Sequence, residues 1–142
     1  MSVEDQERAD ERIPDLLAVP AAVRFLSCEP LLESINIERW LNVRYGQQSG
    51  REHGYSGETR ISWVIVGGES GPRARPFALS WAYSLLKQCR EGHAIGVPCF
   101  IKQLGHQPRR ADNGWDYLTL RDKKGADPTE WPADLRVQQF PE

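Results

Sequence analysis

The run Ile-Ser-Trp-Val-Ile-Val at positions 61–66, followed at once by Gly67 and Gly68, constrains the fold of this chain more than any other segment. β-branched and aromatic residues favour strands. Because polar residues hardly alternate with apolar ones here, the run predicts a strand covered on both faces, as in a parallel α/β sheet. The glycine pair indicates a sharp exit from that strand.

Shorter apolar runs at 22–27 and 97–101 predict two further strands. Between the second and third strands, apolar residues at spacings of three and four predict a helix over 77–89. An amphipathic helix is expected to open the chain near Ser2 and Asp5, and Pro14 is expected to break it or to start a second turn. Strand, helix and strand in this order are typical of parallel β/α units.

The length of the chain limits how many such units it can hold. With 142 residues it forms one domain, whereas a closed eight-unit barrel needs roughly 250. We therefore expect an α/β fold with an incomplete parallel β/α sheet, resembling half a barrel, and flanking helices. A long polar, glycine-rich loop at about 45–59 is expected to be mobile, and the region from about 106 to 142 to be rich in turns.

An open sheet has two edges with unpaired backbone groups, and a stable protein must satisfy them. The chain could self-associate, add a strand to another protein, or cover the edges with its own loop and tail. Of these alternatives we favour a protein partner or a homo-oligomer.

Composition excludes several other classes of protein. The net charge of −2 argues against nucleic-acid binding, although Arg109 and Arg110 form a local basic segment. No apolar run approaches the roughly 20 residues of a membrane span, and the charged N-terminus predicts a cytoplasmic protein. Three widely spaced cysteines, Cys28, Cys89 and Cys99, indicate buried thiols rather than a metal site, and no cofactor is expected.

In parallel α/β folds the segments after the strands carry the chemistry. The loop Gly-Gly-Glu-Ser-Gly-Pro at 67–72 either lets the backbone approach a carboxylate or phosphate, or only makes a tight turn with positive φ. Glu29 and Glu69 could face each other across a pocket as an acid/base pair, or each could cap a helix or pair with an arginine. The candidate ligand-binding residues are Glu29, Gly67, Gly68, Glu69, Ser70, Gly71, Arg73, Lys102 and Gln103.

These motifs carry a resemblance to a known family. The string Trp-Val-Ile-Val-Gly-Gly-Glu-Ser-Gly-Pro at 63–72, Ser-Cys-Glu-Pro at 27–30 and Lys-Gln-Leu-Gly at 102–105 carry most of it, and segments 2–6, 9–14 and 131–137 add to it. Together they resemble the C-terminal half of an uncharacterised phage-associated family. The full-length members of that family resemble radical S-adenosylmethionine (radical SAM) barrel proteins.

The resemblance implies that clustered cysteines in the N-terminal half of full-length relatives hold a [4Fe–4S] cluster. This chain has no such cysteines, so we expect no iron–sulfur chemistry from it alone. We favour a small phage-type protein that acts by protein binding, for example by inhibiting a host or defence protein. Its own Met1 and a complete family terminus support this interpretation. The alternative is the C-terminal half of a split radical-SAM-like enzyme, which retains a ligand pocket and needs a cluster-bearing partner chain.

Overall fold

A three-stranded parallel sheet lies at the centre of the fold. It consists of β1 (Phe25–Cys28), β2 (Trp63–Gly67) and β4 (Cys99–Gln103), in the order β1-β2-β4. The structure is a computed structural model that describes residues 1–41, 60–92, 95–112 and 115–142. The three predicted strands and the incomplete parallel α/β fold are confirmed, and the strands form no closed barrel. The loop expected at 45–59 lies outside the described residues.

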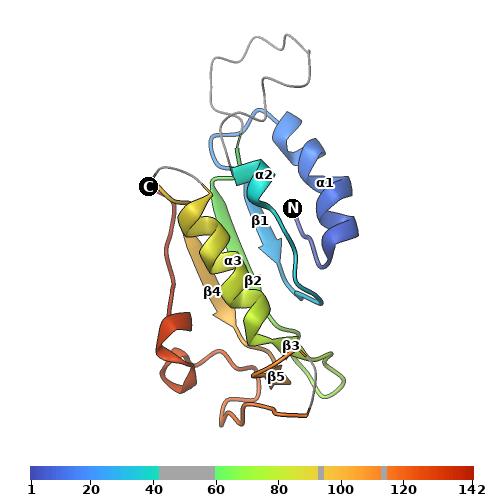
Figure 1. The fold of residues 1–142 in the computed structure, drawn as a ribbon, viewed down its shortest axis with the longest axis vertical. Helices are drawn as coiled ribbons and strands as arrows, with labels where there is room; N and C mark the ends of the chain where they lie inside the picture. The colour runs from blue at the N-terminus through green and yellow to red at the C-terminus, as the bar shows by residue number, and fades with distance from the viewer. Residues whose placement is uncertain (42–59, 93–94, 113–114) are drawn as a thin grey trace.

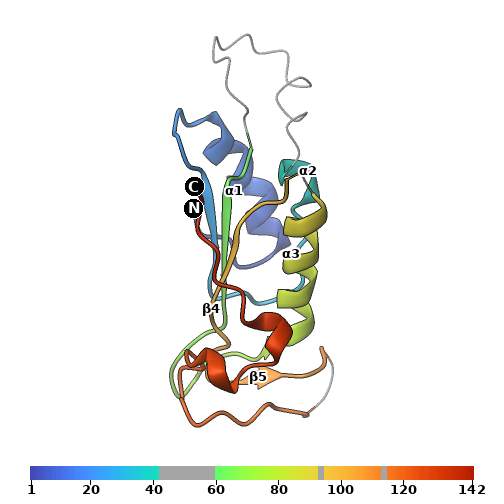
Figure 2. The same cartoon turned by 90° about the vertical axis from the view of Figure 1, so that its left-hand side faces the viewer.

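Two helices pack on the same face of this sheet, as Figures 1 and 2 show. They are α1 (Gln6–Ala18) and α3 (Leu79–Glu91), and the short α2 (Glu38–Leu41) lies beside α3. The core between the helices and the sheet holds alternate strand residues, among them Val64 and Val66 of β2. The predicted helix over 77–89 is confirmed, with its first two residues forming a short strand instead.

The helix α1 begins at Gln6, directly after the predicted Asp5, and does not break at Pro14. Asp5 is its N-cap, and its carboxylate accepts a hydrogen bond from the Arg8 amide at 2.8 Å. The prediction that Pro14 breaks the helix is wrong. Proline cannot donate the backbone bond of a regular turn. Burial of Ile13 and Leu17 on either side of Pro14 stabilises the helix despite that loss.

The region after β4 consists mainly of turns, as predicted. Its regular elements are β5 (Pro108–Arg109), which pairs in parallel with β3 (Phe77–Ala78), and the short 3₁₀ helices η2 (Pro128–Glu130) and η3 (Ala133–Leu135). Asp127 caps η2 through a 2.9 Å bond from the Thr129 amide.

The two ends of the chain close the two edges of the sheet. At the β1 edge, Ser2 forms a parallel bridge with Ser27, and the Ser27 amide donates to the Met1 carbonyl at 2.8 Å. At the β4 edge, Gln138 forms an antiparallel bridge with Phe100. Of the three ways to satisfy the edges, the chain therefore uses its own termini. The expected partner remains a prediction, and it now needs support from another feature.

The prediction that β2 is covered on both faces is met on the helix face only. Val64 and Val66 are buried there, whereas Trp63 and Ile65, which point to the other face, stay partly accessible. A local sequence run cannot distinguish these cases, because both sets of side chains are apolar.

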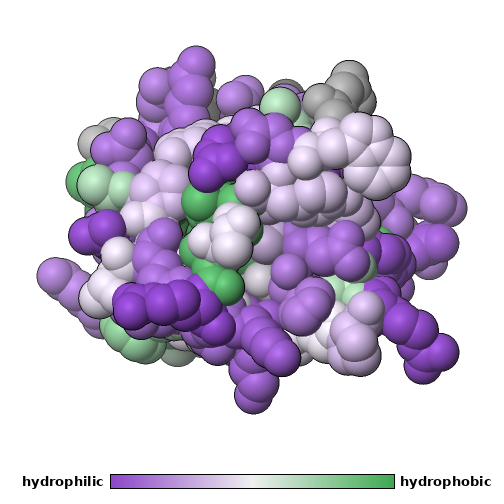
Figure 3. Space-filling model, turned by 90° about the horizontal axis from the view of Figure 1, so that it is seen from below, coloured by the Kyte–Doolittle hydropathy of each residue, from purple (hydrophilic) through white to green (hydrophobic). Residues whose placement is uncertain are grey.

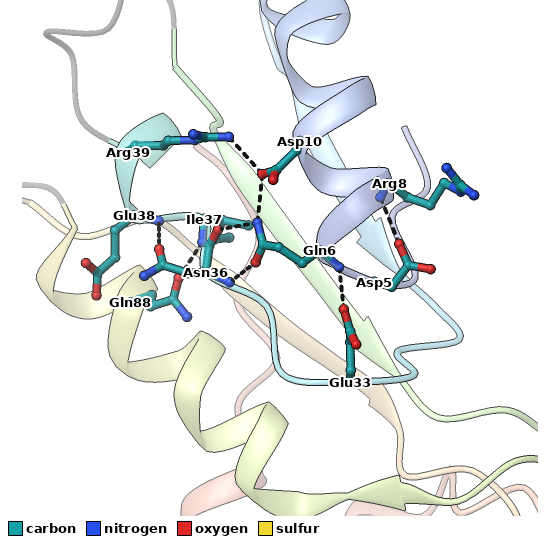
Figure 4. A network of polar contacts seen from close by, with 10 residues as sticks. All are labelled: Asp5, Gln6, Arg8, Asp10, Glu33, Asn36, Ile37, Glu38, Arg39 and Gln88. Carbon is teal, nitrogen blue, oxygen red and sulfur yellow. Dashed lines mark hydrogen bonds and ion pairs between the residues drawn. The ribbon is translucent and has the colours of Figure 1, made fainter.

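A polar network joins the segment before α2 to both helices (Figure 4). Gln88 of α3 is 5% exposed, and its side-chain oxygen accepts a bond from the Ile37 amide at 2.7 Å. Its side-chain nitrogen donates to the Ile35 carbonyl at 2.8 Å. On the other side, Gln6 of α1 exchanges bonds with the backbone of Asn36. These hydrogen bonds fix the position of residues 35–37 between α1 and α3.

Replacing Gln88 with alanine is expected to lower the free energy of unfolding by about 1–3 kcal/mol, because the Ile37 amide and the Ile35 carbonyl lose their partner inside the core. Lys87→Ala, at the adjacent exposed position, is the matched control and should change stability by less than about 0.5 kcal/mol. Urea unfolding followed by tryptophan fluorescence measures both changes. Equal effects of the two substitutions would contradict the structural role of Gln88.

Candidate functional site

An ion pair lies across the C-terminal end of the sheet. Lys102 Nζ, from β4, donates to Glu29 Oε2, just after β1, at 2.8 Å. Lys102 lies on one outer strand and Glu29 directly follows the other, with β2 between those two strands. The Glu29 side chain is 18% exposed and that of Lys102 54% exposed, so the carboxylate is the more enclosed partner.

Gly67 at the end of β2 makes this pair possible. A Cβ atom at Gly67 would lie 3.1 Å from the Glu29 Cδ and 3.2 Å from its Oε1. Because glycine has no side chain, the Glu29 carboxylate can lie directly over β2 and reach Lys102. The structure thus brings together three of the predicted ligand-binding residues.

The next glycine serves the packing of two backbones. A Cβ at Gly68 would lie 2.4 Å from the Leu104 carbonyl oxygen, so only glycine fits without a shift. Gly105, with φ +80°, lies on the other side of this contact. Gln103 is buried, and its side-chain nitrogen donates to the Gly68 carbonyl at 2.8 Å. Gly68 and Gln103 therefore join two loops rather than face a ligand.

Glu69 lies in a separate local interaction. Arg75 donates to its carboxylate from the backbone amide at 2.9 Å and from Nε at 2.8 Å. The side-chain bond from Arg75, with help from the backbone bond, lowers the pKa of Glu69 from 4.5 to about 2. Of the alternatives, pairing with an arginine holds for Glu69, while Glu29 pairs with a lysine. The two glutamates do not form a pair with each other.

The remaining predicted residues lie on the outside of this loop. Ser70 and Arg73 are exposed, and Gly71 has φ +104°, so the positive-φ interpretation of the loop holds at Gly71 but not at the first two glycines. In the basic segment, Arg110 NH1 pairs with Asp116 at 2.7 Å and Arg109 is partly buried. The charge that this segment offers to a nucleic acid is thus reduced.

The sheet face opposite the helices carries an aromatic cluster that the sequence analysis did not identify. Trp63 lies 5.7 Å from Phe25 and 6.2 Å from Phe100, measured between ring centroids. Phe140, near the C-terminus, contacts Trp63 and Phe100, with ring centroids 5.6 Å and 5.1 Å away. Phe25 and Phe140 are nevertheless 39% and 65% exposed.

We call this side of the sheet the open face. Successive side chains of a strand point to opposite sides, so every second residue belongs to it. Aromatic side chains gather where the strands begin, and the ion pair lies where they end. Its members are Phe25, Ser27, Glu29, Trp63, Ile65, Gly67, Phe100 and Lys102.

A family model described as protein of unknown function (DUF5131) matches residues 1–133. The chain belongs to this family. No curated protein and no solved structure matches the chain. The DUF5131 match contains all nine predicted ligand-binding residues and ends before Phe140.

The three cysteines of this DUF5131 chain are free and buried, as predicted. Burial raises the pKa of the Cys28 thiol, and a hydrogen bond with Cys89 together with burial raises that of Cys99. In the part of the chain that the structure describes, no group of three or more His, Cys, Asp or Glu side chains is placed to hold a metal ion. Over the same residues, no helix has the length and apolar character needed to span a membrane.

The end of the molecule below the strands is mostly hydrophilic, with a small apolar area near its centre (Figure 3). A cavity of about 440 Å³ opens in this region between residues 105–108 and 117–123. His106 lies at its wall, with Nδ1 2.9 Å from the Lys123 carbonyl oxygen. Its described lining contains none of the nine predicted residues and no residue of the open face, so it is separate from both.

The low pKa of Glu69 predicts a pH-dependent contribution to stability. A carboxyl whose pKa is depressed in the folded state stabilises the fold above its unfolded pKa and loses that effect as the pH falls through the folded pKa. The contribution should therefore be complete above about pH 5 and disappear towards pH 2. Thermal unfolding of the wild type and Glu69→Gln should differ at pH 7 and converge near pH 2. In an Arg75→Gln background the pH-dependent difference should shrink, because only the hydrogen bond from the backbone amide of residue 75 remains, and an undiminished difference there would contradict the assignment.

Proposed function

We propose that this chain acts by binding another protein through the open face of its sheet. The observation that carries the proposal is that helices cover one face of the sheet (Figure 2), whereas Phe25, Trp63 and Phe100 lie on the other, where Phe140 packs on Trp63 and Phe100. Parallel sheets are ordinarily covered on both faces. Accessible aromatic patches with a polar border are characteristic of protein interfaces.

The open face has the two properties that a specific interface requires. Its aromatic end offers large, rigid side chains of the kind that dominate binding energy. Its other end offers the Glu29 and Lys102 charges, which would set the orientation of a partner. The partner that fits is a protein whose contact surface is apolar at its centre and polar on one side.

A cytoplasmic phage setting, in which the chain inhibits a host or defence protein, belongs to this proposal and is supported by the sequence resemblance. The net charge of −2 and the pairing of Arg110 with Asp116 favour a protein target over a nucleic acid.

A second function is favoured by one specific observation. The Glu29–Lys102 pair lies at the C-terminal ends of parallel strands, where folds of this kind place their active sites. The chain would then be the C-terminal half of a split radical-SAM-like enzyme. A cluster-bearing chain would cover the same open face and complete a ligand pocket next to Gly67.

A photo-crosslinking amino acid at position 25 tests the binding proposal. In cells of the organism that encodes the chain, irradiation should crosslink the chain from position 25 to one or a few defined proteins, because that side chain lies on the open face. Position 83 is the matched control, since Tyr83 is 38% exposed, close to the 39% of Phe25, but lies on α3. The identified partner, purified, should bind Phe25→Glu at least about tenfold more weakly than Tyr83→Glu, a loss of about 1.4 kcal/mol. Equal crosslinking from positions 25 and 83 would contradict the binding proposal.

Iron and sulfide analysis separates the two functions. If the partner is the other half of an enzyme, the anaerobically purified complex should contain about four irons per pair, as one [4Fe–4S] cluster requires. Binding of the partner should then also weaken in Lys102→Gln. An iron-free complex of normal affinity would exclude the split enzyme and leave the binding protein.

A further inference from the structure

The C-terminal tail, residues 137–142, lies along the outer edge of β4 from Val137 to Gln139 and reaches the open face with Phe140 (Figure 1). The Ile101 amide donates to the Val137 carbonyl at 2.8 Å, and the Gln139 amide donates to the Cys99 carbonyl at 3.0 Å. Phe140 then turns onto the rings of Trp63 and Phe100. The tail therefore behaves as a short antiparallel strand that ends in an aromatic anchor.

The side chains of this tail are weakly enclosed. Gln138, Gln139 and Phe140 are all exposed, and Phe140 is 65% accessible although it contacts two rings. Pro141 follows and cannot donate a further strand bond. A few hydrogen bonds and the two ring contacts of Phe140 thus hold the tail in place.

The opposite edge of the sheet is built differently. Residues next to Ser2 pair with β1, but Val3 is completely buried and Arg12 of α1 donates to the Ser2 carbonyl at 2.9 Å. The helix α1 follows directly. That edge is fixed by the core, whereas the tail holds only one partly buried side chain, that of Val137, between Val137 and Phe140.

We propose that the tail occupies a strand-addition site and that the partner binds by replacing it. This inference rests on the protein-binding function proposed above and specifies its mode. The incoming segment runs antiparallel to β4, pairs with the Ile101 amide and the Cys99 carbonyl, and places an aromatic side chain over Trp63 and Phe100. Strand addition of this kind gains affinity from backbone bonds and specificity from the side-chain positions between them.

The tail is tethered to the site that it covers, so it competes with any external strand at an effective concentration in the millimolar range. A partner strand therefore binds tightly only if it makes more contacts than the tail does. The rest of the open face, with Phe25 at one end and Glu29 and Lys102 at the other, supplies those extra contacts. The tail thereby restricts the site to partners that match the whole face.

A labelled peptide with the tail sequence Val-Gln-Gln-Phe-Pro-Glu tests the proposal on the full chain. In the double variant Gln139→Pro, Phe140→Ser the tail loses its bond to Cys99 and its aromatic anchor, so the site should open. The peptide should bind this variant at least about tenfold more tightly than the wild type, in which the tail competes. A peptide with serine in place of phenylalanine should lose most of that affinity. Glu142→Gln, in the same tail, is the matched control and should behave as the wild type.

The Trp63 indole gives a site-specific readout, because its Nε1 donates to the Gln139 carbonyl at 2.9 Å. Its NMR signal should shift in the double variant and return towards the wild-type position when the peptide is added. The single variant Phe140→Ser alters only a largely exposed side chain and should show a smaller gain in peptide affinity. It keeps the proposal testable if the double variant does not fold. Equal peptide binding by wild type and variants, or no binding to either variant, would overturn strand exchange.

The outcomes also separate this inference from the proposed function. A crosslinked partner from position 25 together with failed peptide binding would refute the exchange alone. Peptide binding without any crosslinked partner would leave the exchange site in place and refute the proposed function.

Discussion

The order and direction of the strands determine what the rest of the molecule can do. β1, β2 and β4 are parallel and lie side by side in chain order. Right-handed crossovers between strands that advance in one direction place the connecting elements on one face of the sheet. Barrels use this rule and enclose the other face by closing. With three strands this sheet does not close, so closure of the strands does not enclose its second face.

The two terminal segments pair with the edge strands of the sheet, but they cover little of its open face. Backbone groups at the rims of β1 and β4 find partners in the first and last residues of the chain. This closure removes the strongest general reason for a small parallel sheet to aggregate. Among the residues that the structure describes, Phe140 packs on Trp63 and Phe100, and it belongs to the less enclosed of the two closing segments.

Local patterns allowed the sequence to predict the elements, and long-range contacts limited what it could predict about the site. The three strands and α3 follow from apolar runs and from spacings of three and four, and they lie within a few residues of their predicted positions. The break expected as one alternative at Pro14 does not occur, because burial of the residues around it, a tertiary effect, stabilises the helix. The Glu29–Lys102 pair depends on the register of three strands, which no local signal contains.

The two glycines at the end of β2, Gly67 and Gly68, show again that a local pattern does not reveal long-range contacts. Their clustering predicted a ligand cradle or a turn, yet Gly67 makes room for a carboxylate and Gly68 for another backbone. Both roles require knowing which segment lies opposite. The aromatic cluster of Phe25, Trp63 and Phe100 takes one residue from each of three strands. No local pattern joins these residues, because the pairing of the strands brings them together and the helix-facing residues next to them are equally apolar.

The polarity of the open face limits how a partner can lie on it. A segment added to β4 runs antiparallel to the strand, so its C-terminal end lies near the aromatic rings and its N-terminal end points towards Lys102. Glu29 already neutralises that lysine, so a carboxylate at this end would compete with Glu29 rather than meet an unpaired charge. Discrimination at the polar end should therefore reject wrongly placed charges, while the aromatic end supplies most of the affinity.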